Sequence, residues 1–125
     1  MKCNKGLAKN KEFSVVFKKG KSVADKLLVL YTLPNDKPFT RFGYSVGKKA
    51  GNAVTRNRYK RILREIRRSN DLKIKEGYDC IIIARPRIIG ENYWAIEKSF
   101  LYLVRKARLA KKEMNDGEIV SGKTD

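Results

Sequence analysis

Residues 48–68 read KKAGNAVTRNRYKRILREIRR, and this stretch predicts a long helix with two unlike faces. Its apolar side chains recur at intervals of three and four residues, the spacing of a helix that buries one face. These side chains are Tyr59, Ile62, Leu63 and Ile66. Asn52 is the expected N-cap, because its side-chain oxygen can accept a hydrogen bond from an otherwise unpaired backbone N–H. The helix is therefore predicted over residues 53–68.

The other face of this predicted helix is strongly basic. Residues 48–68 hold nine Lys and Arg against the single acid Glu65, a local balance of +8. A basic run is usually a solvated face, but solvated faces normally interleave both signs. Repulsion left unrelieved in this way suggests that the phosphates of a nucleic acid supply the counter-charge. The candidate RNA-binding residues are Lys48, Lys49, Asn52, Arg56, Asn57, Arg58, Lys60, Arg61, Arg64, Arg67 and Arg68.

The composition of the whole chain agrees with a polyanionic partner. The 125 residues include 30 Lys and Arg, 13 Asp and Glu and no histidine, which gives a net charge of +17. Such an excess disfavours the compact state through self-repulsion, so a partner of opposite charge is expected. The length fits one domain, predicted over residues 1–112. Residues 113–125 are polar and are expected to form a flexible tail.

Further elements are predicted on both sides of the basic helix. Helices are expected over residues 10–20 and 92–111, and strands over residues 26–33, 41–46 and 78–84. The first two strands, joined by a Pro- and Asn-containing turn, predict a hairpin, and the loop has room for further strand pairing. The third strand is apolar at nearly every position, which indicates a central strand covered on both faces. The fold class is therefore α+β, in one compact domain of order α-β-β-(β)-α-β-α.

No catalytic or metal-binding residue is predicted. Without histidine, hydrolysis of a phosphodiester would need carboxylates that hold metal ions, and the acids are scattered along the chain. Cys3 and Cys80 are 77 residues apart and form no ligand cluster. Two cysteines are too few for a disulfide scaffold, and the polar, basic N-terminus does not resemble a signal peptide. Both features indicate a cytoplasmic protein with reduced cysteines. No apolar run approaches the ~20 residues that a membrane span needs.

Residues 48–61, with Arg56-Asn57-Arg58 at their centre, closely resemble the signature of the bacterial ribonuclease P protein family. The resemblance covers about residues 7–110. Further motifs fall in the same order and spacing, namely Val29-Leu30-Tyr31-Thr32, Gly43-Tyr44-Ser45-Val46 and Ile81-Ile82-Ile83-Ala84-Arg85. Tyr44 and Tyr59 stand where aliphatic residues are more usual, which looks like variation in the core. The tail after Lys112 lies outside the resemblance.

The resemblance implies a small protein cofactor of a ribozyme. In this family a large RNA removes the 5′ leader from precursor tRNA in a reaction that requires Mg²⁺, and the protein itself binds no cofactor. The implied partners are ribonuclease P RNA and precursor tRNA, with no membrane and no small-molecule substrate. The family fold also implies a mostly antiparallel sheet packed by helices, with a βαβ crossover that contains the basic helix.

The resemblance also implies two sites. Lys48, Lys49 and the Arg-Asn-Arg helix would face the ribozyme RNA, while Phe13, Phe17 and Tyr31 would line a groove for the single-stranded leader. Stacking on aromatic rings suits a leader because it tolerates any base sequence. A core role for Phe13 and Phe17 stays open, since they share a helical stripe with Val16. The alternative function is a ribosomal protein or RNA chaperone of similar size and charge.

Overall fold

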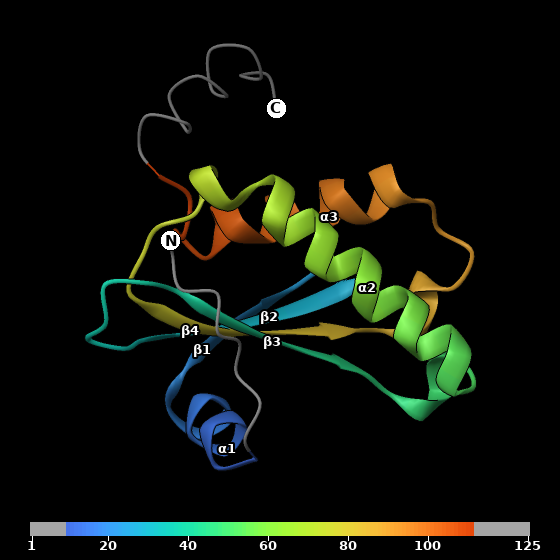
Figure 1. Cartoon of the computed structure of the whole chain (residues 1–125), viewed down its shortest axis with the longest axis horizontal. Helices are drawn as coiled ribbons and strands as arrows, with labels where there is room; N and C mark the ends of the chain where they lie inside the picture. Colours follow the sequence, from blue (N-terminus) through green and yellow to red (C-terminus); the bar gives the residue numbers. More distant parts are fainter. Residues whose placement is uncertain (1–9, 112–125) are drawn as a thin grey trace.

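A mixed four-stranded sheet separates two unequal layers of helices (Figure 1). The computed structural model describes residues 10–111. The elements in chain order are α1 (Asn10–Lys19), β1 (Lys21–Ala24), β2 (Leu28–Pro34), β3 (Arg41–Val46), η1 (Lys48–Ala50), α2 (Ala53–Ser69), η2 (Asp71–Lys73), β4 (Tyr78–Ala84), η3 (Pro86–Ile88) and α3 (Tyr93–Lys106). Helices α2 and α3 cover one face of the sheet and α1 lies on the other. The α+β class and the order of elements are confirmed.

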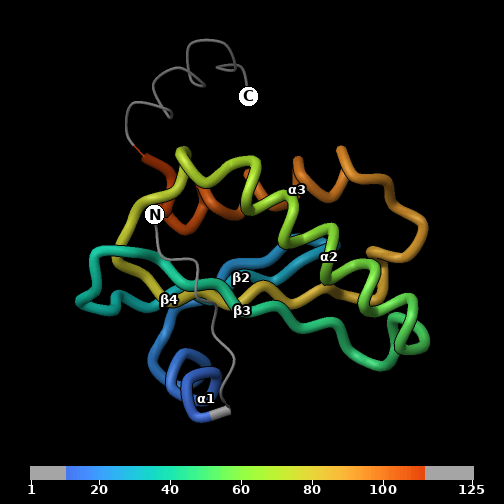
Figure 2. Tube along the Cα trace, viewed as in Figure 1, coloured from blue at the N-terminus to red at the C-terminus, as the bar shows by residue number. Residues whose placement is uncertain are grey.

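The strands lie in the order β1-β2-β4-β3, so the predicted hairpin between β2 and β3 is wrong. Strand β4 lies between them, antiparallel to β2 and parallel to β3. A strand that is apolar on both faces is favoured at the centre of a sheet, and local turn signals do not report that long-range preference. The parallel pair β3 and β4, joined through α2, confirms the βαβ crossover, which the trace in Figure 2 follows.

The sequence predicts an optional further strand in the loop between β2 and β3. The structure has a further strand, β1, but it precedes β2. Strand β1 pairs with β2 through a tight turn at Asp25. The Asp25 carboxylate accepts hydrogen bonds from the backbone N–H groups of Leu27 and Leu28 at 2.9 and 3.0 Å. Its second oxygen accepts one from Ser99 Oγ of α3 at 2.6 Å. The turn is therefore tied to the helix that covers it.

The main core lies between the sheet and the pair α2 and α3. The predicted inner stripe of α2 is confirmed, because Tyr59, Leu63 and Ile66 are buried and Ile62 packs against the same core. Helix α3 ends at Lys106, five residues before its predicted end. Arg108 has a φ of 61°, and the chain beyond it forms an isolated β-bridge between Ala110 and Ile74.

A smaller cluster packs on the other face of the sheet. Val16 of α1 and Ile81 of β4 are fully buried there, with Phe13, Tyr31, Leu33 and Ile83 packed around them. Side chains alternate across a strand, which is why Tyr31 and Ile81 face α1 while their neighbours enter the main core. Helix α1 is therefore held by far fewer apolar contacts than α2.

The predicted tail, residues 113–125, and Cys3 lie outside the described residues. Within residues 10–111, none of the helices has the length and apolar character needed to cross a bilayer.

Candidate nucleic-acid interface

Helix α2 begins where the sequence predicts. Asn52 Oδ1 accepts a hydrogen bond from the backbone N–H of Thr55 at 2.9 Å, which confirms the N-cap. Gly51 before it has a φ of 131°, a conformation that favours glycine. Arg56 Nε donates to the Gly51 carbonyl oxygen at 3.2 Å, so Arg56 lies against the entry to the helix. The start of the basic helix is thus closely defined.

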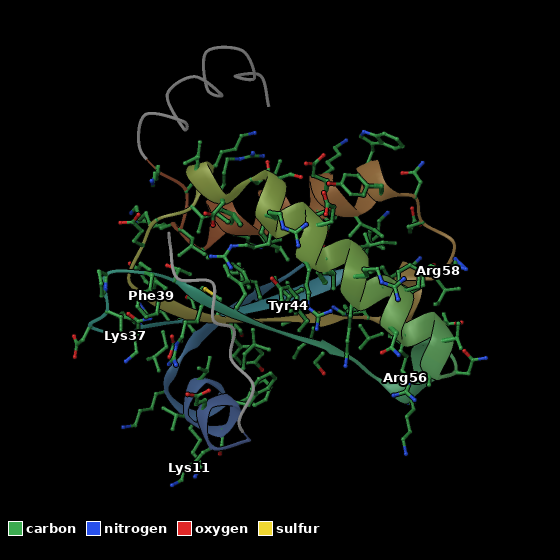
Figure 3. All side chains as sticks on the ribbon, viewed as in Figure 1. Lys11, Lys37, Phe39, Tyr44, Arg56 and Arg58 are labelled. Carbon is green, nitrogen blue, oxygen red and sulfur yellow. The ribbon has the colours of Figure 1, made fainter. Side chains whose placement is uncertain are left out.

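The basic side chains of α2 cover a wide arc of its surface. Asn57, Arg58, Arg61, Arg64 and Arg68 are exposed, whereas Arg56 and Lys60 are half-buried. Figure 3 shows Arg56 and Arg58 near the N-terminal end of the helix. Two residues correspond to about 200° of rotation around a helix, so these two arginines diverge. The surface can therefore meet phosphates on more than one strand of a nucleic acid.

Arg67 does not lie with the other candidates. Its guanidinium carbon lies 4.6 Å from the centre of the Phe42 ring, and its NH2 group donates to the Thr40 carbonyl oxygen at 3.1 Å. Its buried Nε lies 3.0 Å from Asp71 Oδ1, within ion-pair distance although outside hydrogen-bond geometry. Arg67 therefore packs α2 onto β3 and is turned away from the exposed surface.

Arg64 and Arg68 have weaker partners within the chain. The Arg64 guanidinium lies 5.5 Å from the centre of the Tyr44 ring, which a cation–π contact allows. Arg68 NH1 donates to Glu65 Oε1 at 2.6 Å. The Arg68 and Glu65 side chains are 72% and 52% exposed, and such surface pairs contribute only about 0–1 kcal/mol. Both arginines therefore stay accessible to a phosphate.

A second group of basic residues lies at the edge of the sheet where β3 and β4 end. Lys48 and Lys49 follow β3 in η1, and Arg85 and Arg87 follow β4 in and around η3; all four are exposed. Parallel strands end at the same edge, and η1 packs against η3. Sequence reasoning missed Arg85 and Arg87. A prediction that β4 runs parallel to β3 would have placed Arg85 and Arg87 beside Lys48 and Lys49.

The three aromatic candidates on the other face are brought together. The centres of the Phe13 and Phe17 rings are 6.2 Å apart, and those of Phe17 and Tyr31 are 4.9 Å apart with nearly perpendicular planes. Phe17 is 41% exposed, while Val16 beside it is fully buried. The core alternative therefore fails for Phe17 and holds in part for Phe13, which packs on the Val16 cluster.

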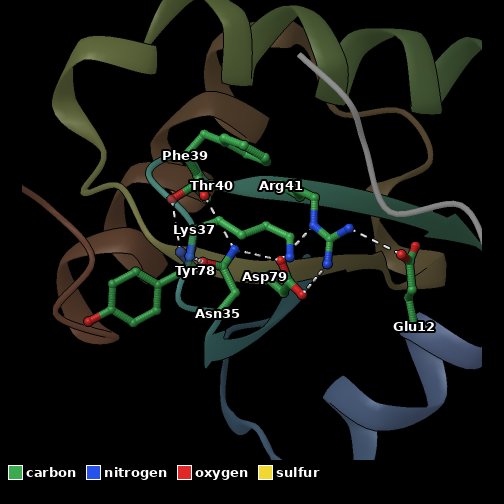
Figure 4. A network of polar contacts seen from close by, with 8 residues as sticks. All are labelled: Glu12, Asn35, Lys37, Phe39, Thr40, Arg41, Tyr78 and Asp79. Atoms are coloured by element: carbon green, nitrogen blue, oxygen red, sulfur yellow. Dashed lines mark hydrogen bonds and ion pairs between the residues drawn. The ribbon is translucent and has the colours of Figure 1, made fainter. Parts of the chain in front are cut away.

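A buried ion pair between Arg41 of β3 and Asp79 of β4 is joined by Glu12 of α1 (Figure 4). Arg41 Nε and NH2 donate to the two Asp79 oxygens at 2.8 and 2.6 Å, and Arg41 NH1 donates to Glu12 Oε2 at 3.1 Å. Burial alone would raise the pKa of Asp79, but hydrogen bonds from Arg41 and Asn35 outweigh it and hold this pKa below its usual value. The pKa of Arg41 is raised, chiefly by its hydrogen bond to Asp79. Sequence reasoning missed Arg41, for which Asp79 inside an apolar strand was the only signal.

The acidic side chains and the thiol of the described chain form no further cluster. Across residues 10–111 no three His, Cys, Asp or Glu side chains gather closely enough to hold a metal ion. Cys80 is fully buried in β4, and burial raises the pKa of its thiol well above the usual value. A thiol in such a place is unreactive.

Comparisons with known proteins agree with this geometry. A family model described as Ribonuclease P matches residues 1–108. The ribonuclease P protein component of Alkaliphilus metalliredigens is 43% identical over 109 residues, which are 87% of this chain and 98% of that protein. The component of Clostridioides difficile is 45% identical, over 85% of this chain and 94% of that protein.

Solved structures of the same kind share the fold. The RNase P protein of Staphylococcus aureus matches with a TM-score of 0.80 and 35% identity, over 88% of this chain and 100% of that chain. The RNase P protein of Thermotoga maritima matches with a TM-score of 0.77 and 30% identity, over 82% of this chain and 97% of that chain. The chain therefore belongs to the ribonuclease P protein family.

Proposed function

We propose that this chain, as the protein component of ribonuclease P, binds the RNA subunit through the exposed arginines of α2 and through Lys48 and Lys49. The RNA subunit then performs the phosphodiester hydrolysis. The observation that carries this proposal is the one-sided charge of α2, in which Glu65 is the only acid of a seventeen-residue helix. Neutralising phosphates releases condensed counterions, so such a surface favours a structured RNA. Guanidinium groups can also fork onto phosphates with two hydrogen bonds.

The aromatic surface of α1 and β2 is proposed to hold the leader of precursor tRNA. The ring of Phe17 is exposed and is braced edge-on by Tyr31. A base stacked on an aromatic ring gains about 1–3 kcal/mol whatever its identity, which suits leaders of differing sequence. A ribosomal protein or RNA chaperone would need the basic helix but not this second, aromatic surface.

The Mg²⁺ ions of the reaction are proposed to bind to the RNA, whose phosphate oxygens are the hard ligands that Mg²⁺ prefers. The protein's part is then electrostatic and positional, because it lowers the repulsion between RNA chains that must approach each other. Because its proposed substrate is precursor tRNA, the chain is also proposed to act in the cytoplasm.

The test is reconstitution with a bacterial ribonuclease P RNA at low Mg²⁺, with removal of the leader from precursor tRNA as the readout. The wild-type chain should accelerate cleavage, and the double variant Arg56→Ala/Arg58→Ala should lose most of that effect. Lys37→Ala removes one exposed charge from the loop between β2 and β3 and is the control for loss of a surface charge away from α2 (Figure 3). No acceleration by the wild-type chain would refute the proposal.

The leader surface has its own test. Phe17→Ala should weaken binding of precursor tRNA by the holoenzyme about fivefold or more, the low end of the stacking strength of one base. Binding of mature tRNA, which lacks the leader, should hardly change. An equal loss for both RNAs would show that Phe17 serves the fold of α1 and not the leader.

A further inference from the structure

The outer face of α3 carries two exposed aromatic rings that the core does not use. Trp94, the only tryptophan of the chain, is 71% exposed, and Tyr102 is 44% exposed. They are eight residues apart, which places them on the same side of the helix and about 12 Å apart along its axis. The Tyr93 and Trp94 rings are in contact, with centres 5.7 Å apart and planes inclined at 68°.

Basic side chains accompany the two rings. Lys98 is exposed and lies one turn from each of them, at the (i, i+4) spacing that brings helical side chains together. The Lys106 ammonium lies 5.5 Å from the centre of the Tyr102 ring. The single acid of α3, Glu97, is turned toward α2, where its carboxylate accepts a hydrogen bond from Asn70 Nδ2 at 2.9 Å. The outer face is therefore aromatic and positively charged, without an opposing carboxylate from its own helix.

The packing of α3 does not explain these rings. The helix is fixed to the sheet by Ile96, Phe100 and Leu103, which are all buried on the opposite side. A large exposed ring forgoes the stabilisation of burial, and exposed aromatic clusters usually mark a binding surface. A second copy of this chain would bring another +17 charge toward the same lysines, so self-association is disfavoured.

We propose that Trp94, Lys98, Tyr102 and Lys106 form a second RNA-binding surface, which takes an unpaired stretch of RNA. Bases stack on the rings of Trp94 and Tyr102, the phosphate between them lies near Lys98, and the phosphate beyond Tyr102 lies near Lys106. Alternation of rings and cations is the pattern by which proteins hold single strands without regard to sequence. This surface lies across the sheet from α1 (Figure 1), so it differs from the proposed leader surface.

The single tryptophan makes the proposal directly measurable. The fluorescence of the full chain should be quenched, to saturation, by an oligouridylate of about twelve nucleotides, which exceeds the span of the two rings. Inorganic polyphosphate of equal charge should bind the protein without this quenching, since it has no base to stack. Tyr102→Ala should raise the dissociation constant read from the tryptophan about fivefold or more. Lys98→Ala should raise the same dissociation constant. It should also lower, by about one, the slope of the logarithm of affinity against the logarithm of salt concentration. The control Lys37→Ala should change neither quantity.

Each contrary outcome overturns the proposal. Absence of quenching by oligouridylate, or equal quenching by polyphosphate, would show that no base stacks on Trp94. A fluorescence change on raising the protein concentration alone would indicate a second copy as the occupant. Loss of the quenching in Phe17→Ala would show that the RNA binds at α1 and affects Trp94 indirectly. Because leader removal by the reconstituted holoenzyme is measured separately, failure here would leave the proposed function standing.

Discussion

Replacement of Asp79 by asparagine tests the buried ion pair that joins β3 to β4. The Asp79 carboxylate accepts two hydrogen bonds from Arg41 and one from Asn35, whose Nδ2 lies 2.8 Å from Asp79 Oδ1. Asparagine keeps the volume but replaces one acceptor oxygen by an NH2 donor. At least one donor of Arg41 or Asn35 then faces another donor, and Arg41 keeps only Glu12 as a charged partner.

The expected loss of stability follows from how deeply the pair is buried. The Arg41 and Asp79 side chains are only 15% and 10% exposed. Breaking a buried pair by removing one partner costs about 3–5 kcal/mol, and the remaining exposure puts this pair near the low end. A loss of about 3 kcal/mol corresponds to a fall in Tm of roughly 10–20 °C for a domain of this size.

Urea unfolding followed by far-ultraviolet circular dichroism measures this loss. The urea concentration at the midpoint of unfolding should fall. The slope of the unfolding free energy against urea concentration should stay the same, because the surface exposed on unfolding is unchanged. Glu12→Gln is the control, and it should lose less than about 1 kcal/mol because the Glu12 side chain is 30% exposed. An Asp79→Asn variant within about 0.5 kcal/mol of the wild type, the usual range for surface changes, would refute the reasoning.

The same variant predicts a dependence on pH. The pKa of Asp79 is lower in the folded than in the unfolded chain, so its stabilisation is complete above the unfolded pKa of about 3.9. That stabilisation is lost as the pH falls through the folded pKa, where the protonated side chain resembles asparagine. The difference in unfolding free energy between wild type and Asp79→Asn should therefore be constant near neutral pH and shrink below about pH 4. A difference that stays constant down to pH 2 would contradict this assignment.

Three further changes test local features of the fold. A Cβ at Gly20 would meet two backbone oxygens at 2.6 and 2.7 Å, so Gly20→Ala should lower the free energy of unfolding by about 1–3 kcal/mol, measured by urea unfolding. Asn52→Ala removes the N-cap of α2 and should lose about 1 kcal/mol in the same assay, and no loss would argue against the cap. In a Cys3→Ser background the buried Cys80 thiol, whose pKa is raised by burial, should react with iodoacetamide far more slowly in the native than in the urea-unfolded chain. Equal rates would show that β4 opens readily.

Much of the basic helix could be predicted because its signals are local. The interval of its apolar residues and the side chain of Asn52 act within a few residues of each other, and both are as expected in the structure. The central position of β4 was also predictable, since its residues are apolar on both faces. The gathering of Phe13, Phe17 and Tyr31 rested on the family resemblance, which carries long-range information that periodicity lacks.

The features that were missed depend on contacts between distant parts of the chain. The order of the strands is decided by β4, which lies more than thirty residues after the turn that suggested a hairpin. Arg41 acquires its role only because β3 pairs with β4 and brings it beside Asp79, 38 residues away. Arg67 differs from its neighbours because β3 places the ring of Phe42 beneath it. At 100° per residue Arg67 lies closer than Arg64 to the buried stripe of α2, but the helix alone does not identify its partner on β3.

Whether an arginine can bind RNA depends on how deeply its carboxylate partner is buried. The number of charges in the chain does not determine it. Arg41 is held by charged hydrogen bonds, worth about 1.5–3 kcal/mol each, and a phosphate would have to leave water to replace them. Arg68 has a similar partner at a similar distance, but that pair lies in solvent and contributes about 0–1 kcal/mol. A phosphate that forms a forked hydrogen bond can therefore displace Glu65 from Arg68, but cannot displace Asp79 from Arg41. The same residue type thus stabilises the fold where its partner is buried and stays available to RNA where its partner is exposed.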